Sequence, residues 1–286
     1  MKKFFTAIIS VFVIMSLLTG CQTNAESNTA ENEESSASTS STNTTNVAQT
    51  TVEATGVASK AYSTDKVVWG PGRAENNERP SDPVSLQEAY GNLGAQFIMS
   101  DDKFICLTFD EGYENGFTPA ILDTLKEKNV KAIFFVTYDF AKDNPELIER
   151  MIDEGHIIGN HSYRHYTMDE VSLDEAKEEI EYLDKYMKEA FKYRMTLFRF
   201  PKGEFSESTL ALADELGYKS VFWSFAYADW DVDNPADSAE AFEEITQHFH
   251  NGEIMLLHAV SKTNAEILGS VIDEAVSQGY RFTTEV

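Results

Sequence analysis

The stretch FICLTFDEGYENGFTPAILDTLKEKNVKAIFFV, residues 104–136, contains one complete strand–helix–strand unit. Its ends, Phe104–Phe109 and Ala132–Val136, are short apolar runs rich in β-branched and aromatic residues, which is typical of buried strands. Between them, Thr118–Lys128 has helical periodicity, and Thr118-Pro119 is a favourable helix start because a capping hydroxyl precedes a proline. The unit therefore predicts two parallel strands joined by a crossover helix.

The same alternation continues to the end of the chain. Four further strands and a weaker last one are expected at His156–Gly159, Thr196–Phe200, Ser220–Ser224, Glu253–Leu257 and Tyr280–Phe282. Helical patterns accompany them at Asn144–Glu154, Leu173–Phe191, Ser206–Leu216, Ser238–His250 and Asn264–Gln278. About seven strand–helix repeats with short connections favour a (β/α) barrel over a doubly wound sheet. We therefore predict an α/β protein with a barrel of about seven strands in a single domain.

Residues 1–60 have the composition of an address and a tether. Lys2 and Lys3 precede an apolar run that ends at Leu18, the pattern of a secretory signal peptide. The following Thr19-Gly20-Cys21 completes a resemblance to a bacterial lipobox, in which Cys21 bears the lipid; an ordinary signal peptide is the alternative. The next residues, up to 59, include no aromatic residue, so we expect disorder. The predicted organisation is a signal at 1–20, a tether at 21–60 and one folded domain at 61–286.

The charge balance excludes several classes of protein. With 23 Lys+Arg against 48 Asp+Glu, the formal net charge is −25. Nucleic-acid binders that neutralise phosphates need clustered Lys and Arg, and docking on anionic lipid needs a basic patch. The 2 Cys can form neither a disulfide framework nor a C-x-x-C zinc site. We expect no nucleic-acid partner, and membrane attachment only through a lipid on Cys21, as in an extracytoplasmic bacterial lipoprotein.

Polar side chains collect just beyond the carboxyl ends of the expected strands. In a parallel barrel these ends meet on one rim, where such folds place their chemistry. Charged residues scattered at random along the chain would not fall repeatedly at the ends of strands. The residues that follow a strand are Asp110, Glu111, His161, His165, Asp229 and Trp230; His258 ends a strand, and Arg199 lies within the strand Thr196–Phe200. The sequence therefore predicts a functional site on this rim.

Two of the histidines have the spacing of metal ligands. His161 and His165 are four residues apart, so on a helical turn they would face the same way and could share one metal ion. A chance pair is the alternative in a chain with 6 His. A carboxylate from another strand end would complete a site suited to Zn²⁺, Co²⁺ or a similar divalent ion. One divalent metal is therefore the expected cofactor.

Other rim residues suggest acid–base chemistry. Asp110 and Glu111 are adjacent after a buried strand, so one suits a general base and the other a metal ligand, with a helix N-terminal pair as the alternative. Asp229 could hydrogen-bond His258 and raise its pKa for use as a general acid, although an isolated rim histidine is the alternative. Arg199 is expected to pair with a rim carboxylate.

Five short motifs occur here in the order found in a known family. They are Thr108-Phe109-Asp110-Glu111-Gly112, His161-x3-His165, Arg199-x-Pro201-x-Gly203, Asp229-Trp230 and Leu256-Leu257-His258. From about Trp69 to Val286 the chain resembles the NodB-homology polysaccharide deacetylases, carbohydrate esterase family 4. It is most similar to the delta-lactam-biosynthetic de-N-acetylases, which act on muramic acid in peptidoglycan. That narrower resemblance lies in Tyr113-Glu114-Asn115-Gly116, Gly155-His156-Ile157-Ile158-Gly159-Asn160-His161, Phe222-Trp223-Ser224 and His258-Ala259-Val260-Ser261.

The resemblance implies a deformed (β/α) barrel and metal-dependent removal of an acetyl group from an N-acetylated sugar. Asp110 would be the general base, oriented by Arg199. His258, tuned by Asp229, would protonate the leaving amine. The metal would be bound by His161 and His165. The residues implied in substrate binding are Trp230, Leu256, Tyr113 and Asn115.

Glu111 departs from the pattern of the family. The broad family usually has Asp at this position, and the muramic-acid subgroup tends to have Asn. Glu keeps the charge and adds one methylene, about 1.5 Å of reach. We favour Glu111 as a third metal ligand; the other possibility is that it swings away and leaves a two-histidine site completed by water.

These observations together predict a metal-dependent de-N-acetylase of N-acetylmuramic acid residues, acting as a monomer on the peptidoglycan glycan strand. One alternative is the same chemistry on N-acetylglucosamine residues of peptidoglycan or another glycan. An alternative of a different class is a glycan-binding module on a decayed deacetylase barrel, at which Glu111 alone hints.

Overall fold

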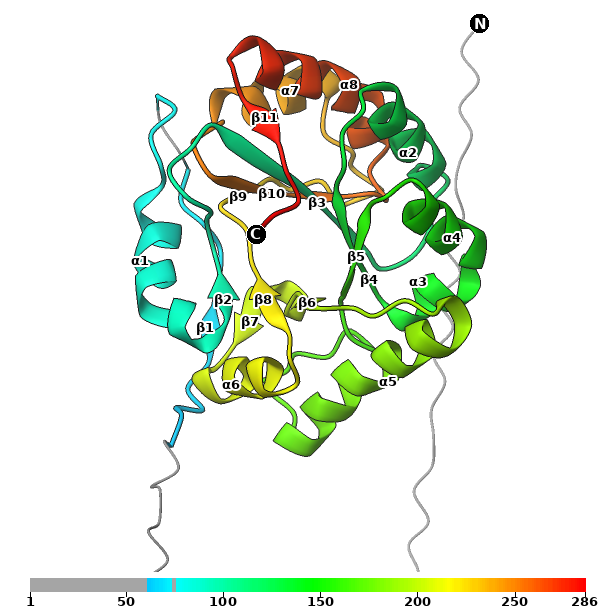
Figure 1. Ribbon diagram of the computed structural model, residues 1–286. Helices are drawn as coiled ribbons and strands as arrows, with labels where there is room; N and C mark the ends of the chain where they lie inside the picture. The colour runs from blue at the N-terminus through cyan, green and yellow to red at the C-terminus, as the bar shows by residue number, and fades with distance from the viewer. Residues whose placement is uncertain (1–60, 74–75) are drawn as a thin grey trace, which may run out of the picture. The chain divides into compact units, whose positions relative to one another are not determined.

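A parallel sheet of 9 strands curls around the centre of the molecule, and helices pack against its outer surface (Figure 1). The computed structural model describes residues 61–73 and 76–286, which belong to one compact unit. The predicted signal peptide, the tether and Cys21 lie outside the described residues. In spatial order the strands are β2 (Ala95–Gln96), β8 (Lys219–Val221), β6 (Leu197–Phe198), β5 (Ile157–Asn160), β4 (Ile133–Val136), β3 (Phe104–Glu111), β10 (Glu253–His258) and β9 (Phe225–Ala226), with β11 (Arg281–Phe282) paired to β3.

Helices alternate with these strands along the chain. The α-helices are α1 (Ser81–Tyr90), α2 (Thr118–Glu127), α3 (Tyr138–Asp143), α4 (Pro145–Asp153), α5 (Leu173–Phe191), α6 (Glu207–Glu215), α7 (Ser238–Gln247) and α8 (Lys262–Ser277). Two 3-10 turns, η1 (Gly91–Leu93) and η2 (Pro201–Gly203), and a small antiparallel pair, β1 (Val67–Val68) with β7 (Glu204–Phe205), complete the described elements. No helix in the described part of the chain is long and apolar enough to cross a membrane.

The predicted fold class is confirmed. Each strand and helix expected from the sequence has a counterpart, with ends shifted by at most 3 residues. Among the described residues, the edge strands β2 and β9 pair on one side only, so the barrel stays open between them and is deformed. The sheet exceeds the predicted seven strands because β2 and β9 have 2 residues each, too few for a periodic pattern. The helix α1 was missed because Pro83 is its one buried residue.

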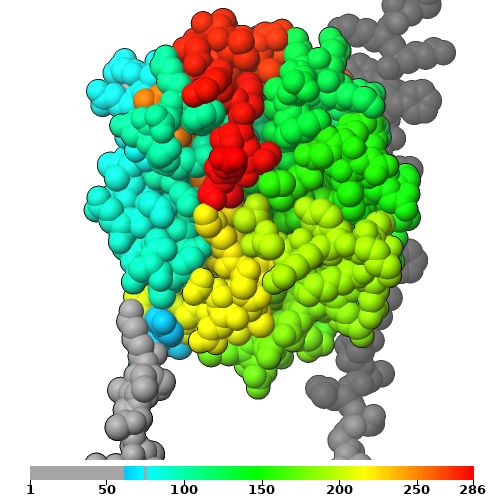
Figure 2. Space-filling model, in the orientation of Figure 1, coloured from blue at the N-terminus to red at the C-terminus, as the bar shows by residue number. Residues whose placement is uncertain are grey.

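The C-terminal segment closes one end of the barrel. In Figure 2 this segment (red) fills the middle of the visible face, between the cyan, green and yellow parts of the chain. Arg281 and Phe282 of β11 pair with Phe104 and Ile105, the first residues of β3, so this face lies where the strands begin. The carboxyl ends of the strands therefore meet at the opposite rim.

The register of the parallel strands decides which residues meet at that rim. At the end of β3, Asp110 pairs with His258 of β10 and with Phe135 of β4. The four residues of β4 are all 0% exposed, because the barrel interior covers one face and helices cover the other. Because the strands are buried on both faces, the polar residues at their ends have fixed positions relative to one another.

Candidate active site

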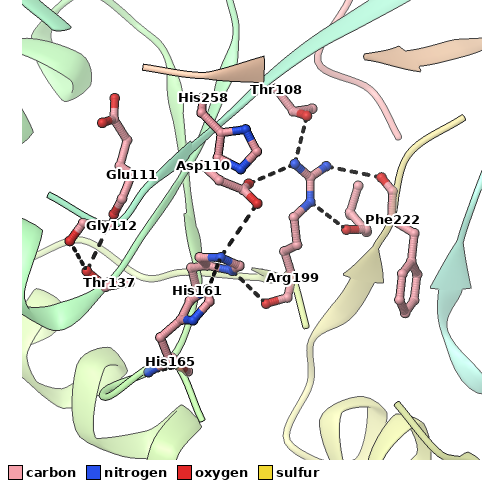
Figure 3. A network of polar contacts seen from close by, with 12 residues as sticks. Thr108, Asp110, Glu111, Gly112, Thr137, His161, His165, Arg199, Phe222 and His258 are labelled. Carbon is pink, nitrogen blue, oxygen red and sulfur yellow. Dashed lines mark hydrogen bonds and ion pairs between the residues drawn. The ribbon is translucent and has the colours of Figure 1, made fainter. Parts of the chain in front are cut away.

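An ion pair at the end of β3 forms the centre of the site. Arg199 is 0% exposed, and its Nη1 donates to Asp110 Oδ1 at 2.9 Å and to Thr108 Oγ1 at 2.8 Å (Figure 3). The other guanidinium nitrogens are bound by backbone carbonyls: Nε donates to Val221 O at 2.9 Å and Nη2 to Phe222 O at 3.0 Å. Each of the three guanidinium nitrogens is therefore hydrogen-bonded, and the guanidinium in turn orients Asp110. Arg199 thus pairs with a rim carboxylate, as the sequence predicted.

The surroundings of Asp110 keep its carboxyl ionised. Burial alone would raise the pKa of Asp110, but the positive charge of Arg199 and the imidazoles of His161 and His258 outweigh it, so the pKa is lowered. An ionised carboxylate with one oxygen on Arg199 leaves its second oxygen, Oδ2, available. This oxygen lies 3.5 Å from His161 Nε2.

The two histidines of the predicted metal pair converge. His161 Nε2 lies 3.1 Å from His165 Nε2, and the two rings meet edge to face. The Nδ1 of His161 donates to Arg199 O at 3.0 Å, which leaves the lone pair of Nε2 directed into the site. Burial lowers the pKa of both imidazoles, that of His165 to about 4. Two neutral imidazoles with converging Nε2 atoms suit a borderline divalent metal.

The backbone between these histidines is a loop, so the expected helical turn is wrong. Residues 161–165 carry no helical assignment, and both Ser162 (φ 73) and His165 (φ 60) are left-handed. A non-glycine residue rarely adopts this conformation, and two of them within five residues are incompatible with a regular helical turn. The four-residue spacing brings the imidazoles together through this loop rather than through helical periodicity.

The structure does not bring Glu111 to the histidine pair. Successive residues of a strand face opposite sides, so Glu111 points away from Asp110 and His161 (Figure 3). Its carboxylate is 0% exposed and accepts from Thr118 Oγ1 at 3.4 and 3.5 Å, at the start of α2. Burial, together with the nearby charge of Glu114, raises the pKa of Glu111 well above its ordinary value. The expected ligand set of two histidines and Glu111 is therefore not assembled.

Among the described residues, no group of three or more His, Cys, Asp or Glu side chains is arranged to hold a metal ion. The residues that fit a metal are His161 and His165, and the carboxylate beside them is Asp110.

A second His–Asp pair lies at the end of β10. Asp229 accepts from His258 twice, through Nδ1 at 2.6 Å and the backbone N–H at 2.7 Å. The Nδ2 of Asn264 donates to Asp229 at 2.6 Å and to His258 O at 3.0 Å, so the pair is tied to α8. Burial would lower the pKa of His258, but Asp229 raises it above the ordinary value. With Nδ1 bound to Asp229, the opposite ring nitrogen Nε2 is left to exchange a proton.

These groups line one cavity of about 750 Å³. Of the predicted site residues, those at its wall are Asp110, Tyr113, His161, His165, Trp230, Leu256 and His258. Arg199 and Asp229 hold Asp110 and His258 in place by hydrogen bonds. Asn115 is not in the lining; its amide donates to the carbonyl of Val260, a lining residue, at 3.0 Å.

Sequence reasoning missed part of the cavity wall. The segment from Trp69 to Arg73 and the side chains of Lys202 and Tyr227 also line it. The Gly70-Pro71-Gly72 run was a loop signal, but nothing local tied it to the rim. Its position follows from Trp69, whose Nε1 donates to Trp223 O at 3.0 Å across the fold.

In an open (β/α) barrel, the site brings together a buried ionised carboxylate, a histidine with a raised pKa and a pair of neutral histidines around one cavity. Residues 99–221 match the family model for polysaccharide deacetylases. Peptidoglycan-N-acetylmuramic acid deacetylase PdaA of Bacillus subtilis is 39% identical over 226 residues, which cover 78% of this chain and 86% of that protein. The chain belongs to the polysaccharide deacetylase family and is a hydrolase that acts on carbon–nitrogen bonds.

Solved structures agree with this assignment. The structure of Bacillus subtilis PdaA, a family 4 carbohydrate esterase, superposes with a TM-score of 0.74 at 38% identity, covering 77% of this chain and 95% of that one. A family 4 carbohydrate esterase from Bacillus anthracis gives a TM-score of 0.65 at 39% identity, covering 78% and 95%. The predicted family is therefore confirmed.

Proposed function

We propose that the protein removes the acetyl group from N-acetylmuramic acid residues of peptidoglycan. The observation that carries the proposal is the pairing of Asp110 and His258 in register at the ends of β3 and β10, on the wall of one cavity. One group is ionised and the other has a raised pKa, so a proton acceptor and a proton donor stand side by side. The similarity to PdaA over most of both chains supports the substrate class.

In the proposed reaction each side chain has a separate task. Asp110 accepts a proton from the attacking water, while Arg199 holds the carboxylate in one orientation. His258 donates a proton from Nε2 to the leaving amine, and Asp229 stabilises the imidazolium from which it comes. When bound at His161 and His165, a divalent metal supplies Lewis-acid polarisation of the acetamide carbonyl. The products are acetate and the free amino sugar.

Two cations in the cavity wall favour an acidic sugar. N-acetylmuramic acid differs from N-acetylglucosamine by a lactyl ether that carries a carboxylate. Lys202 lies in the wall; its Nζ donates to Thr167 Oγ1 at 3.1 Å and forms no ion pair in the described part of the chain. Arg73 also lines the cavity and pairs with Glu244 at 2.6 Å. In a chain of net charge −25, an unpaired lysine at this place provides a partner for the lactyl carboxylate.

The test uses purified full-length protein loaded with zinc. It is incubated with glycan strands with and without stem peptides, and acetate release is assayed. Mass spectrometry then locates the loss of about 42 Da that deacetylation produces. We expect the loss on muramic acid. A loss on glucosamine alone would favour the alternative substrate, and glycan binding without acetate from any acetylated glycan would favour a binding module.

A second part of the proposal concerns location. Relatives that act on peptidoglycan work outside the cytoplasm, and we propose that a lipid on Cys21 holds this domain at the outer surface of the membrane. The expected result is a mass increase of a diacylglycerol at Cys21 in the mature chain. Cys21→Ser should release the protein from membranes; retention of that variant at the membrane would contradict the anchor.

A further inference from the structure

The loop that carries the histidine pair is held through its backbone N–H groups. Five consecutive N–H groups each have an acceptor, although the loop belongs to no helix or strand. The donors and acceptors are His161 N to Val136 O (2.9 Å), Ser162 N to Asn160 Oδ1 (2.8 Å), Tyr163 N to Glu179 O (3.0 Å), Arg164 N to Glu179 Oε2 (2.6 Å) and His165 N to Ser162 Oγ (2.9 Å). Two of the five acceptors belong to one residue, Glu179.

Glu179 occupies a place where a carboxylate is unexpected. It lies on α5, in the stripe of buried residues that includes Ala176, Ile180 and Leu183. Glu179 is only 1% exposed, and a buried carboxylate costs free energy unless it is paired. Its partners are the N–H of Arg164, the guanidinium of Arg164 at 3.6 Å and the side chain of Ser162; burial raises the pKa of Glu179, and these partners oppose the rise. Glu179 therefore contributes a polar contact at a position where the rest of the stripe contributes packing.

What it contributes is compensation for backbone strain. The left-handed residues Ser162 and His165 are strained, because residues other than glycine rarely adopt this conformation unless the surroundings impose it. The carboxylate of Glu179 binds the N–H of Arg164, which lies between them, and a charge-assisted hydrogen bond to an N–H is roughly twice as strong as a neutral one. Its own backbone carbonyl binds the preceding N–H, that of Tyr163. The loop is thus anchored to the rigid helix α5 at two successive residues.

We propose that Glu179 is a positioning residue that sets the approach of His161 and His165, and through it the affinity of the pair for a divalent metal. Glu179 has no hydrogen bond to either imidazole in the described part of the chain; it acts through the backbone N–H of Arg164. The inference rests on the metal-binding role proposed for the two histidines. Its structural half, the conformation of residues 161–165, can be measured without any metal.

The test compares four forms of the full-length protein. Glu179→Ala removes the acceptor and the charge, and Glu179→Gln removes the charge but keeps an acceptor oxygen. The matched control is Glu178→Ala: Glu178 is the adjacent carboxylate on α5 and also contacts Arg164, at 3.6 Å, but accepts from no N–H of the loop. Two quantities are measured: the zinc dissociation constant, by competition with a chromophoric chelator, and the hydrogen-exchange rates of the amides of residues 162–165.

We expect Glu179→Ala to bind zinc about 10- to 100-fold more weakly, the usual cost of removing an outer support of metal ligands. Its loop amides should exchange at least about tenfold faster than those of wild type, which corresponds to about 1.4 kcal/mol of local opening free energy. Glu179→Gln should show a smaller loss of zinc affinity and a smaller increase in exchange rate. Glu178→Ala should match wild type in both measurements. Unchanged exchange and zinc affinity in Glu179→Ala would overturn the inference, as would equal losses in all three variants, which would indicate a charge effect.

Two further outcomes are also decisive. If wild type binds no zinc, the proposed metal site fails, and the exchange rates alone still decide whether Glu179 holds the loop. If Glu179→Ala does not fold, Glu179→Gln is compared with Glu178→Gln, which removes the same charge: faster loop exchange only at position 179 supports the inference, and equal exchange contradicts it.

Discussion

The two halves of the site are built in different ways. Asp110 and His258 end adjacent parallel strands, and their position follows from a register of six successive residue pairs between β3 and β10. His161 and His165 instead lie on a loop with two left-handed residues, held by side chains from β5 and α5. The strand half inherits its geometry from the barrel. The loop half depends on a few hydrogen bonds. Single substitutions there should therefore lower the metal affinity more than they lower kcat at saturating metal.

The largest effect is expected in the strand half. Asp110→Asn keeps an acceptor for Arg199 but removes the proton acceptor, so kcat should fall about 10²- to 10⁴-fold. Excess zinc should not restore it. Acetate release at saturating zinc measures the effect, and circular dichroism verifies the fold. Activity within about tenfold of wild type would exclude Asp110 as the general base.

The loop half should respond differently. Ser162→Ala removes the oxygen that accepts from His165 N–H at 2.9 Å and leaves the strand residues untouched. We expect zinc affinity to fall about tenfold, with kcat at saturating zinc close to that of wild type. The zinc dependence of acetate release separates the two quantities. A kcat that stays low at saturating zinc would show that the two halves are not separable.

The pH profile probes the second strand-end pair. Asp229 raises the pKa of His258, so Asp229→Asn should lower that pKa and move the basic limb of kcat/KM to lower pH. The sign follows because a general acid acts only while protonated, and the variant loses its proton at a lower pH. Above the wild-type limb the loss should be about 10- to 100-fold. Asp231→Asn, at an exposed neighbour, is the control; an unmoved basic limb in Asp229→Asn would remove His258 from the role of acid.

The smallest effect on activity is expected at Glu111, the neighbour of Asp110 in the sequence. Glu111 faces away from the histidines, so Glu111→Gln should change neither zinc affinity nor kcat. The variant should be more stable at neutral pH, because burial raises the pKa of Glu111 and its ionisation therefore opposes folding.

The stability difference should shrink as the pH falls from the raised pKa of Glu111 in the folded chain, and it should vanish below the ordinary pKa of a glutamate, where the carboxyl is neutral in both the folded and the unfolded chain. Melting temperatures across pH measure it, at about 2–4 °C for each kcal/mol in a domain of this size. A loss of zinc affinity in Glu111→Gln would restore the ligand role that the sequence predicted for this residue.

Local patterns carried most of the fold. Apolar runs and helical periodicity marked the long strands and helices, and the phase of polar residues at strand ends placed Asp110, His161 and His258 on one rim. The elements that escaped are short or lack an apolar stripe, such as α3 with 6 residues. Elements this short leave no periodic pattern, and the partners of the strands β2 and β9 lie far away in the sequence.

The site was predicted less completely than the fold. Spacing placed His161 and His165 together, but for a reason that the loop contradicts. Because Asp110 and Glu111 are adjacent on a strand, their side chains were expected to point in different directions. Which of the two faces the histidines depends on which face of β3 is turned into the barrel. Lys202 lay between quoted motif residues and received no role, since its place in the cavity wall follows from the turn η2.

By itself, the sequence determined the order of strands and helices, the family motifs and the rim on which they meet. The hydrophobic period is a local property, and the carboxyl ends of parallel strands meet on one rim whatever their register. The tertiary structure decided the orientation of Glu111 and the path of residues 161–165. The acceptors for Tyr163 and Arg164 come from Glu179, 16 and 15 residues further along the chain on a separate helix. A hydrogen bond between elements that meet only in the folded barrel leaves no periodic trace in the sequence.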